Sequence, residues 1–300
     1  MKFSVILNRD GGTLRTLDLD ALSARIRQTL GREGHEVDIE IPGRNGVAAA
    51  LEKAAMKGRA DVVMAGGGDG TISAAAGALA GKDAALAILP AGTMNLFARG
   101  LGIPQNLDAA VAAFATGRIR RVDVASANGR VFIHQYSVGM HPRLVELREE
   151  MDYGSRIGKM RASVRAAIMT LRRPPRVHAT LELDSTELRI VASSLGISNN
   201  LFGEGHLPYA EMPDSGELGI YIARAWRGAD IARFMMHMAA GRWQGNPEVE
   251  VRRATEATLI LDKGGRGLTC AIDGELCEAE EKTVIRSLPG ALKVLIPAAP

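Results

Sequence analysis

The stretch AGGGDGT, Ala65 to Thr71, places four glycines and one carboxylate in seven residues, directly after the apolar run DVVMA. So much glycine in one place indicates either a sharp turn or a close approach by another group. A glycine-rich turn between a buried strand and the Ala-rich segment ISAAAGALA presents backbone N–H groups where a helix dipole also favours anions. Phosphate is the ligand that this arrangement predicts.

The amino-acid sequence of this turn differs from those of both common phosphate-binding loops. It lacks the Gly-Lys-Ser/Thr of a Walker A loop, and Thr71 stands where a dinucleotide fingerprint has its last glycine. Asp69 beside a phosphate would repel it unless a cation intervened, so the loop implies Mg²⁺. The alternative is a plain glycine turn that carries a solvated aspartate.

A second stretch, LAILPAGTMNLFARGLGIP at residues 86–104, repeats the plan of strand, glycine-containing turn and helix. Thr93 and Asn95 supply hydrogen-bonding side chains at its turn. Ligands of open α/β sheets bind at the carboxyl ends of the strands. Two such turns on neighbouring strands are therefore expected to face one crevice.

The order of the apolar segments predicts two domains, 1–122 and 123–300. Before residue 122, strands at 2–8, 36–42, 60–65 and 85–90 alternate with helices at about 18–31, 45–58 and 107–116. This alternation is typical of βαβ units in a doubly wound parallel sheet. After Val122 the segments are β-rich, which predicts a mainly antiparallel domain. Two helices interrupt it, at about 155–171 and at about 230–240, the latter with Asp230 as N-cap and Gly241 past its end.

Composition limits the partners of the chain. The hydrophobic fraction of 46% suffices for two cores, and a net charge of +3 with a pI near 9.0 does not demand a nucleic-acid partner. The start, MKFSVILNRDGG, reads as a first strand, and no stretch approaches the ~20 apolar residues of a membrane span. We expect a cytoplasmic protein that touches the inner membrane face only peripherally. A homo-oligomer is left open.

Near the C-terminus, Asp273-Gly274 in AIDGEL is expected to form a two-residue hairpin turn. Counting outward from this turn, Cys270 opposes Cys277 at a hydrogen-bonded position. In a reducing compartment these are free thiols. The histidines, among them His134, His141 and His206, have no metal-ligand spacing and read as ordinary histidines.

Taken in order, LNRDGG, GGGDGT, LPAGTMNLFARGLGIP, RRVDVA, SNNLFGEGHLPYAEMPDSGELGIYI and AIDGEL resemble the diacylglycerol kinase catalytic-domain family. This family includes bacterial lipid kinases and their sphingosine and ceramide kinase relatives. The resemblance covers nearly the whole chain. It implies a phosphofructokinase-like nucleotide domain followed by a β-sandwich that receives the lipid acceptor, with ATP and Mg²⁺ as cofactors and a lipid hydroxyl at a membrane surface as substrate.

The resemblance also implies roles for single residues. Asp69 would organise the Mg²⁺, and Glu275 would take the proton from the lipid hydroxyl with Asp273 beside it. Asp214 is the candidate ligand of a second, structural metal. The ATP phosphates would be held by Asn8, Gly66, Gly67, Gly68, Gly70, Thr71, Gly92, Thr93 and Asn95.

Four departures from the family pattern keep other functions open. Leu96 follows Asn95 where many members have aspartate, and Ser215 stands in place of a second metal-binding aspartate. The opening motif NRDGG lacks the usual proline and hydroxyl residue, and GMHPR replaces Gly-Phe-Asp-Ala. The alternatives to a lipid kinase are a kinase acting on NAD and a catalytically weak nucleotide-binding regulatory protein.

Overall fold

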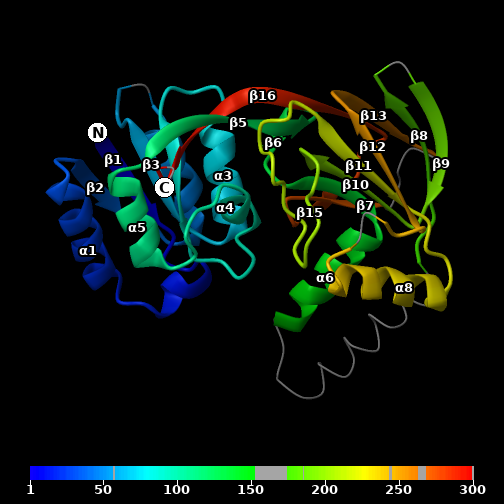
Figure 1. The fold of residues 1–300 in the computed structure, drawn as a ribbon, viewed down its shortest axis with the longest axis horizontal. Helices are drawn as coiled ribbons and strands as arrows, with labels where there is room; N and C mark the ends of the chain where they lie inside the picture. Colours follow the sequence, from blue (N-terminus) through cyan, green and yellow to red (C-terminus); the bar gives the residue numbers. More distant parts are fainter. Residues whose placement is uncertain (57, 153–173, 185, 243–244, 263–267, 299–300) are drawn as a thin grey trace.

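The computed structural model describes residues 1–298 except 57, 153–173, 185, 243–244 and 263–267. Two units lie side by side, an α/β unit and a β-sandwich (Figure 1). The first half of the chain forms β1 (Lys2–Leu7), η1 (Gly12–Thr16), α1 (Leu19–Arg32), β2 (Glu36–Glu40), η2 (Arg44–Gly46), α2 (Val47–Ala54), β3 (Val62–Gly67), α3 (Asp69–Leu79), β4 (Ala85–Pro90), α4 (Leu96–Gly100), α5 (Leu107–Ala115), β5 (Arg118–Ala127), β6 (Arg130–Phe132) and β7 (Gln135–Gly139). The second half forms α6 (Met140–Asp152), β8 (Val177–Leu183), β9 (Thr186–Ala192), β10 (Ser194–Asn199), β11 (Leu218–Ala223), α8 (Gly228–Ala239), β12 (Val249–Ala254), β13 (Glu256–Leu261), β14 (Thr269–Ile272), β15 (Glu275–Glu278) and β16 (Lys282–Ile296).

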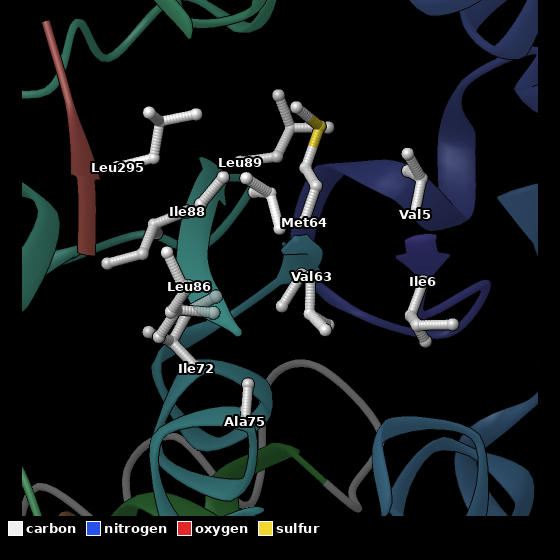
Figure 2. Close-up of a cluster of buried hydrophobic side chains, with 14 of the residues drawn as sticks. Val5, Ile6, Val63, Met64, Ile72, Ala75, Leu86, Ile88, Leu89 and Leu295 are labelled. Atoms are coloured by element: carbon white, nitrogen blue, oxygen red, sulfur yellow. The ribbon is translucent and has the colours of Figure 1, made fainter. Parts of the chain in front are cut away.

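The α/β unit is built on parallel strands in the order β2-β1-β3-β4. Helices α1 and α5 pack against each other, as do α2 and α3, and right-handed crossovers place these two pairs on opposite faces of the sheet. Every residue of β3 and β4 is buried, as expected for strands that are covered on both faces. Figure 2 shows Ile72 and Ala75 of α3 packed against this sheet.

The second unit is a sandwich of antiparallel sheets. One sheet has the order β12-β11-β10-β7-β14-β15, and the other is the part of the long sheet formed by β16, β13, β8 and β9 with β5 and β6 beside it. Their facing side chains form a second apolar core that includes Phe132, Leu181, Ile197 and Ile220. The predicted fold class, a doubly wound nucleotide-type domain followed by a β-sandwich, is confirmed.

Strand β16 joins the two units. Its first residues pair with β13 in the sandwich, and its last residues pair with β5 and lie parallel to β4, with Val294 opposite Leu86. The side chains of Leu292, Val294, Leu295 and Ile296 are thereby buried in the core of the α/β unit. The boundary at residue 122 stays a prediction, and the structure adds that the end of the chain returns to the first unit.

Most predicted elements are present, with two differences in the described residues. Helix α6 was not expected, because its sequence has little amphipathic pattern. Helix α8 begins at Gly228, so Asp230 lies inside its first turn and accepts the N–H of Arg227 (3.0 Å) instead of forming the N-cap. The helix expected at 155–171 lies outside the described residues. In the part of the chain that the structure describes, no helix is long and apolar enough to cross a bilayer.

The position of Leu295 gives the first prediction. This side chain is fully buried in the core of the α/β unit, so Leu295→Ala should lower the free energy of unfolding by ~2–5 kcal/mol. Leu17→Ala, at a leucine that is 42% exposed, is the matched control and should stay within ~0.5 kcal/mol of wild type. Urea unfolding measures both. Equal effects would mean that the end of β16 does not stabilise the unit.

Candidate functional site

The carboxyl ends of β1, β3 and β4 bring three loops together. Asn8, which follows β1, donates its backbone N–H to the carbonyl of Gly66 (2.9 Å) and its side-chain amide to Thr71 Oγ1 (2.9 Å). Thr13 donates its N–H to the carbonyl of Ala91 (2.8 Å), which closes the first loop onto the third. The two glycine turns therefore lie next to each other at this edge of the sheet, where the crevice that the sequence predicts would lie.

The glycines of these turns serve two different purposes. A Cβ on Gly67 would lie 2.5 Å from Thr71 Oγ1, and one on Gly92 would lie 2.9 Å from the Cα of Gly68, so both positions are needed for packing. Gly66 is equally crowded, with Leu7 at 2.7 Å. A Cβ on Gly68, by contrast, would meet nothing closer than 3.8 Å. Packing within the free protein therefore does not explain why residue 68 is a glycine. The expected reason remains the close approach of a ligand to its backbone.

Helix α3 begins directly after this open position. Gly68 is its N-cap residue, and no side chain caps it. The first N–H groups of an α-helix have no partner within the helix, and the dipole makes this end positive. Gly70 in the first turn is exposed. The start of α3 is thus an anion-binding end that solutes can reach.

Asp69 connects the second glycine turn to the third loop. Its carboxylate accepts the backbone N–H groups of Asn95 (3.2 Å) and Leu96 (3.0 Å). Asn95 is left-handed (φ 49°), and its side chain accepts the N–H of Gly92 (2.9 Å) and donates to the carbonyl of the same residue (3.0 Å). Thr93 is exposed at the tip of the turn. Asp69 and Asn95 hence shape the loops in the free protein, and their predicted ligand roles stay predictions.

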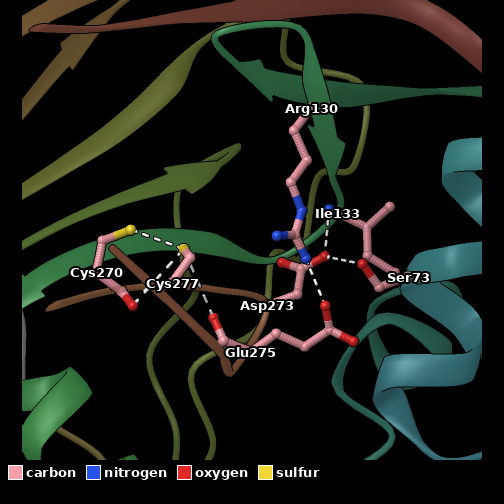
Figure 3. A network of polar contacts seen from close by, with 7 residues as sticks. All are labelled: Ser73, Arg130, Ile133, Cys270, Asp273, Glu275 and Cys277. Carbon is pink, nitrogen blue, oxygen red and sulfur yellow. Dashed lines mark hydrogen bonds and ion pairs between the residues drawn. The ribbon is translucent and has the colours of Figure 1, made fainter. Parts of the chain in front are cut away.

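Asp273 is one contact point between the two units (Figure 3). Its carboxylate accepts the hydroxyl of Ser73 on α3 (2.6 Å) and the backbone N–H groups of Ile133 (2.9 Å), His134 (2.8 Å) and Gln135 (3.0 Å). Burial raises the pKa of this carboxyl group, and the four hydrogen bonds oppose that rise. With these bonds made, Asp273 fixes positions of other groups, and its predicted part in the chemistry stays a prediction.

The hairpin that carries Asp273 has the expected register. Asp273 (φ 49°) and Gly274 (φ 84°) form its two-residue turn, Ile272 opposes Glu275, and Cys270 opposes Cys277. The cysteines are free thiols with their sulfur atoms 2.7 Å apart. Burial and the neighbouring thiol raise the pKa of Cys270 to about 12, so it stays protonated at neutral pH.

Glu275 lies beside the start of α3. A Cβ on Gly70 would lie only 3.8 Å from Glu275 Oε1, so this carboxylate lies against the first turn of α3. Its other oxygen, Oε2, forms an ion pair with the guanidinium of Arg130, the first residue of β6. Both side chains are about half exposed, Arg130 at 47% and Glu275 at 59%. A carboxylate and a cation therefore stand beside the anion-binding end of α3.

His134 lies behind this crevice. Burial, then the neighbouring His141, lowers its pKa to about 4, while the charge of Asp69 acts in the opposite direction. Its ring stacks on Phe202 at 4.8 Å. Together with Leu96 and the buried amides of Asn199 and Asn200, it lines one small pocket between the units. A histidine that is neutral at pH 7 is suited to pack there and does not add charge to the crevice.

No metal centre of protein side chains is present among the described residues, since no three His, Cys, Asp or Glu side chains gather. Asp214 forms an ion pair with Arg120 (2.5 Å), so a cation of the protein already occupies this carboxylate. Its predicted role as the ligand of a structural metal stays a prediction. Asp69 fits the predicted Mg²⁺ role, because a carboxylate oxygen that accepts one N–H retains a lone pair, and Mg²⁺ is commonly held by one carboxylate and the phosphates of a nucleotide.

The structure thus brings together most of the predicted site. The loops at the ends of β1, β3 and β4 carry Asn8, Thr71, Asp69, Asn95 and the five glycines. Asp273 and Glu275 contact α3 from the hairpin, whereas Asp214 pairs with Arg120. Sequence analysis missed Ser73, Arg130 and His134. For Arg130 a signal exists, because it follows Asn128-Gly129, a second two-residue turn with φ 46° and 86°. Nothing in the sequence indicated that Arg130 would pair with the carboxylate of Glu275.

Comparison with known proteins adds the family. Residues 2–127 match the family model described as the diacylglycerol kinase catalytic domain, and residues 139–296 match the YegS C-terminal NAD kinase beta sandwich-like domain.

Two relatives carry the name "Probable lipid kinase YegS-like". That of Pseudomonas aeruginosa (strain UCBPP-PA14) is 29% identical over 273 residues, which are 88% of this chain and 86% of the relative. That of Klebsiella pneumoniae (strain 342) is 37% identical over 115 residues, only 37% of this chain and 39% of the relative. A solved structure described as a diacylglycerol kinase from Bacillus anthracis str. Sterne is 21% identical, with a TM-score of 0.72 over 98% of this chain and 96% of that one. At this identity the last match shows the fold alone.

The four bonds of Asp273 give the second prediction. Asparagine fits the backbone of such a turn, because Asn128 has the same left-handed conformation. At position 273, however, the NH₂ group of an asparagine would face backbone N–H donors that now bind the carboxylate. Asp273→Asn should therefore lower the free energy of unfolding by ~1–3 kcal/mol in urea unfolding. Asp83→Asn, at a side chain that is 83% exposed, should change it by less than ~0.5 kcal/mol. If both variants unfold like wild type, Asp273 does not hold the units together.

Proposed function

Because the chain belongs to the diacylglycerol kinase catalytic-domain family of lipid kinases, we propose that it transfers the γ-phosphoryl group of ATP to a hydroxyl of diacylglycerol or a similar lipid. ATP and Mg²⁺ are the proposed cofactors. A lipid with acyl chains is held in a bilayer by burial of its apolar surface, so the enzyme would meet its acceptor at a membrane surface.

The observation that carries this proposal is the position of Glu275 against the first turn of α3. A phosphate chain that approaches Gly68 and ends at the N–H groups of Asp69 and Gly70 would bring its terminal group to this carboxylate. Phosphoryl transfer needs chiefly positioning and neutralisation of charge. A base beside an anion-binding helix end supplies the minimum set for such a reaction.

The residues of this chain would divide the work as follows. Gly68 admits the phosphates, the start of α3 binds them, and Asp69 would hold the Mg²⁺ that neutralises part of their charge. Asp273 keeps the hairpin with Glu275 at a fixed place relative to α3 through Ser73. Glu275 accepts the proton of the lipid hydroxyl as its oxygen attacks phosphorus.

A second candidate function is a catalytically weak, nucleotide-binding regulatory protein, which Leu96 favours. Many relatives have aspartate at this position, whereas here only the backbone N–H of Leu96 takes part in the site, as a donor to Asp69. One carboxylate fewer would weaken the hold on a metal. A kinase acting on NAD is the third candidate.

One assay separates the three candidates. The protein is incubated with γ-labelled ATP and Mg²⁺ in the presence of mixed lipid vesicles and NAD. Label that moves into the organic phase supports the lipid kinase, and label on NAD supports the third candidate. ATP binding without transfer supports the regulatory protein and would contradict the proposed activity.

The space at Gly68 gives the third prediction. Gly68→Ala should fold normally, because its Cβ would have room in the free protein, but it should weaken ATP binding by ~10-fold or more, since the methyl group intrudes on the phosphates. Gly77→Ala, in the same helix with nothing within 4 Å of its Cβ, is the matched control and should bind ATP like wild type. Calorimetric titration measures both. Equal affinities would remove the glycine turn from the ATP site.

The fourth prediction concerns Glu275. Glu275→Gln keeps the volume of the side chain, so the melting temperature should stay unchanged while single-turnover transfer slows by ~10²–10⁴-fold. Glu278→Gln, at another exposed position of the same strand, is the control and should leave the rate alone. A wild-type rate for Glu275→Gln would show that this carboxylate is not the base.

A further inference from the structure

The pair formed by Arg130 and Glu275 occupies the proposed reaction centre in the free protein. Arg130 approaches from β6 and Glu275 from β15 (Figure 3). Because both side chains are about half exposed, such a pair contributes little to stability. It can therefore be exchanged for another partner at little cost.

The surroundings of the pair indicate which partner could replace the carboxylate. Glu275 Oε1 lies against Gly70, while Arg130 holds Oε2, so the guanidinium is separated from the first turn of α3 by a single carboxylate group. Strand β6 also packs on α3, which keeps the backbone of Arg130 close to that helix. The end of a phosphate chain bound at the start of α3 would come within reach of this guanidinium.

We propose that Arg130 is a catalytic residue that leaves Glu275 and binds the γ-phosphoryl group when ATP occupies the crevice. This inference rests on the proposed function. The guanidinium neutralises charge on the transferred group, for which its planar, bidentate geometry is well suited. Its departure leaves Glu275 free to act as a base.

The step balances with the groups already named. The lipid oxygen forms a bond to the γ-phosphorus, and the bond from that phosphorus to the oxygen bridging to the β-phosphate breaks. The hydroxyl proton passes to Glu275, and ADP leaves with the electron pair of the broken bond. No oxidant or reductant takes part.

A merely structural role for Arg130 predicts different behaviour. If the guanidinium only orients Glu275, its removal should not distinguish ATP from ADP, because ADP lacks the group that we assign to it. If it only stabilises the fold, its removal should lower the melting temperature and weaken the binding of ATP and of ADP to the same extent. The difference between ATP and ADP affinity is therefore the decisive quantity.

The test measures Mg²⁺-ATP and Mg²⁺-ADP affinity by calorimetry for wild type, Arg130→Gln, Arg130→Lys and the control Arg286→Gln, whose arginine forms an exposed cross-strand pair with Glu256. Arg130→Gln should weaken the binding of ATP by ~10–100-fold and that of ADP by less than ~3-fold. The ATP affinity of Arg130→Lys should lie between those of Arg130→Gln and wild type. Arg286→Gln should change neither. In single turnover, Arg130→Gln should slow transfer by ~10³-fold or more.

The contradicting results are distinct from those that would contradict the proposed function. Equal changes for ATP and ADP in Arg130→Gln, or no change for either, would overturn the role of Arg130 and leave the kinase proposal intact. A wild-type protein that binds neither nucleotide would overturn the proposed function, and the role of Arg130 with it. Melting temperatures of the same samples show whether each variant is folded.

Discussion

The carboxylate of Asp273 is the contact on which the arrangement of the site depends. One side chain at a hairpin turn accepts hydrogen bonds from α3 of the α/β unit and from the segment that leads into β7 of the sandwich. A carboxylate offers about four acceptor positions, and here four donors use them. Because Glu275 is two residues further along the same hairpin, this contact sets the distance between Glu275 and the start of α3.

The rest of the crevice follows from how closely three loops pack. Gly67 and Gly92 have no room for a side chain. Asp69 binds backbone N–H groups of the neighbouring loop, and the side chain of Asn95 binds Gly92 within its own loop. Asp69 and Asn95, which the sequence predicts to bind ligands, therefore hold the loops in place in the free protein. The backbone at Gly68 and Gly70 stays accessible, and the carboxylate of Glu275 and the guanidinium of Arg130 lie beside it. This arrangement suits a reaction in which positioning and charge dominate.

The local patterns predicted the α/β strands, the glycine turns, the hairpin register and the meeting of two turns at one crevice, because each depends on a few neighbouring residues. Contacts between distant parts of the chain were not predictable. The return of Leu292 to Ile296 to the first core, the bond from Ser73 to Asp273 and the pair of Arg130 with Glu275 each join residues that the sequence separates widely. The turn at Asp273 could be predicted from the sequence, whereas the four groups that donate hydrogen bonds to its carboxylate could not.

The central claim is that a phosphate chain bound at the start of α3 ends beside Glu275. The most direct measurement is a crystal structure of the protein with Mg²⁺ and a non-hydrolysable ATP analogue. The account predicts phosphate oxygens on the N–H groups of Asp69 and Gly70, with the terminal phosphate on the side of the helix that faces Glu275. A nucleotide bound elsewhere, or a terminal phosphate pointing away from Glu275, would contradict it.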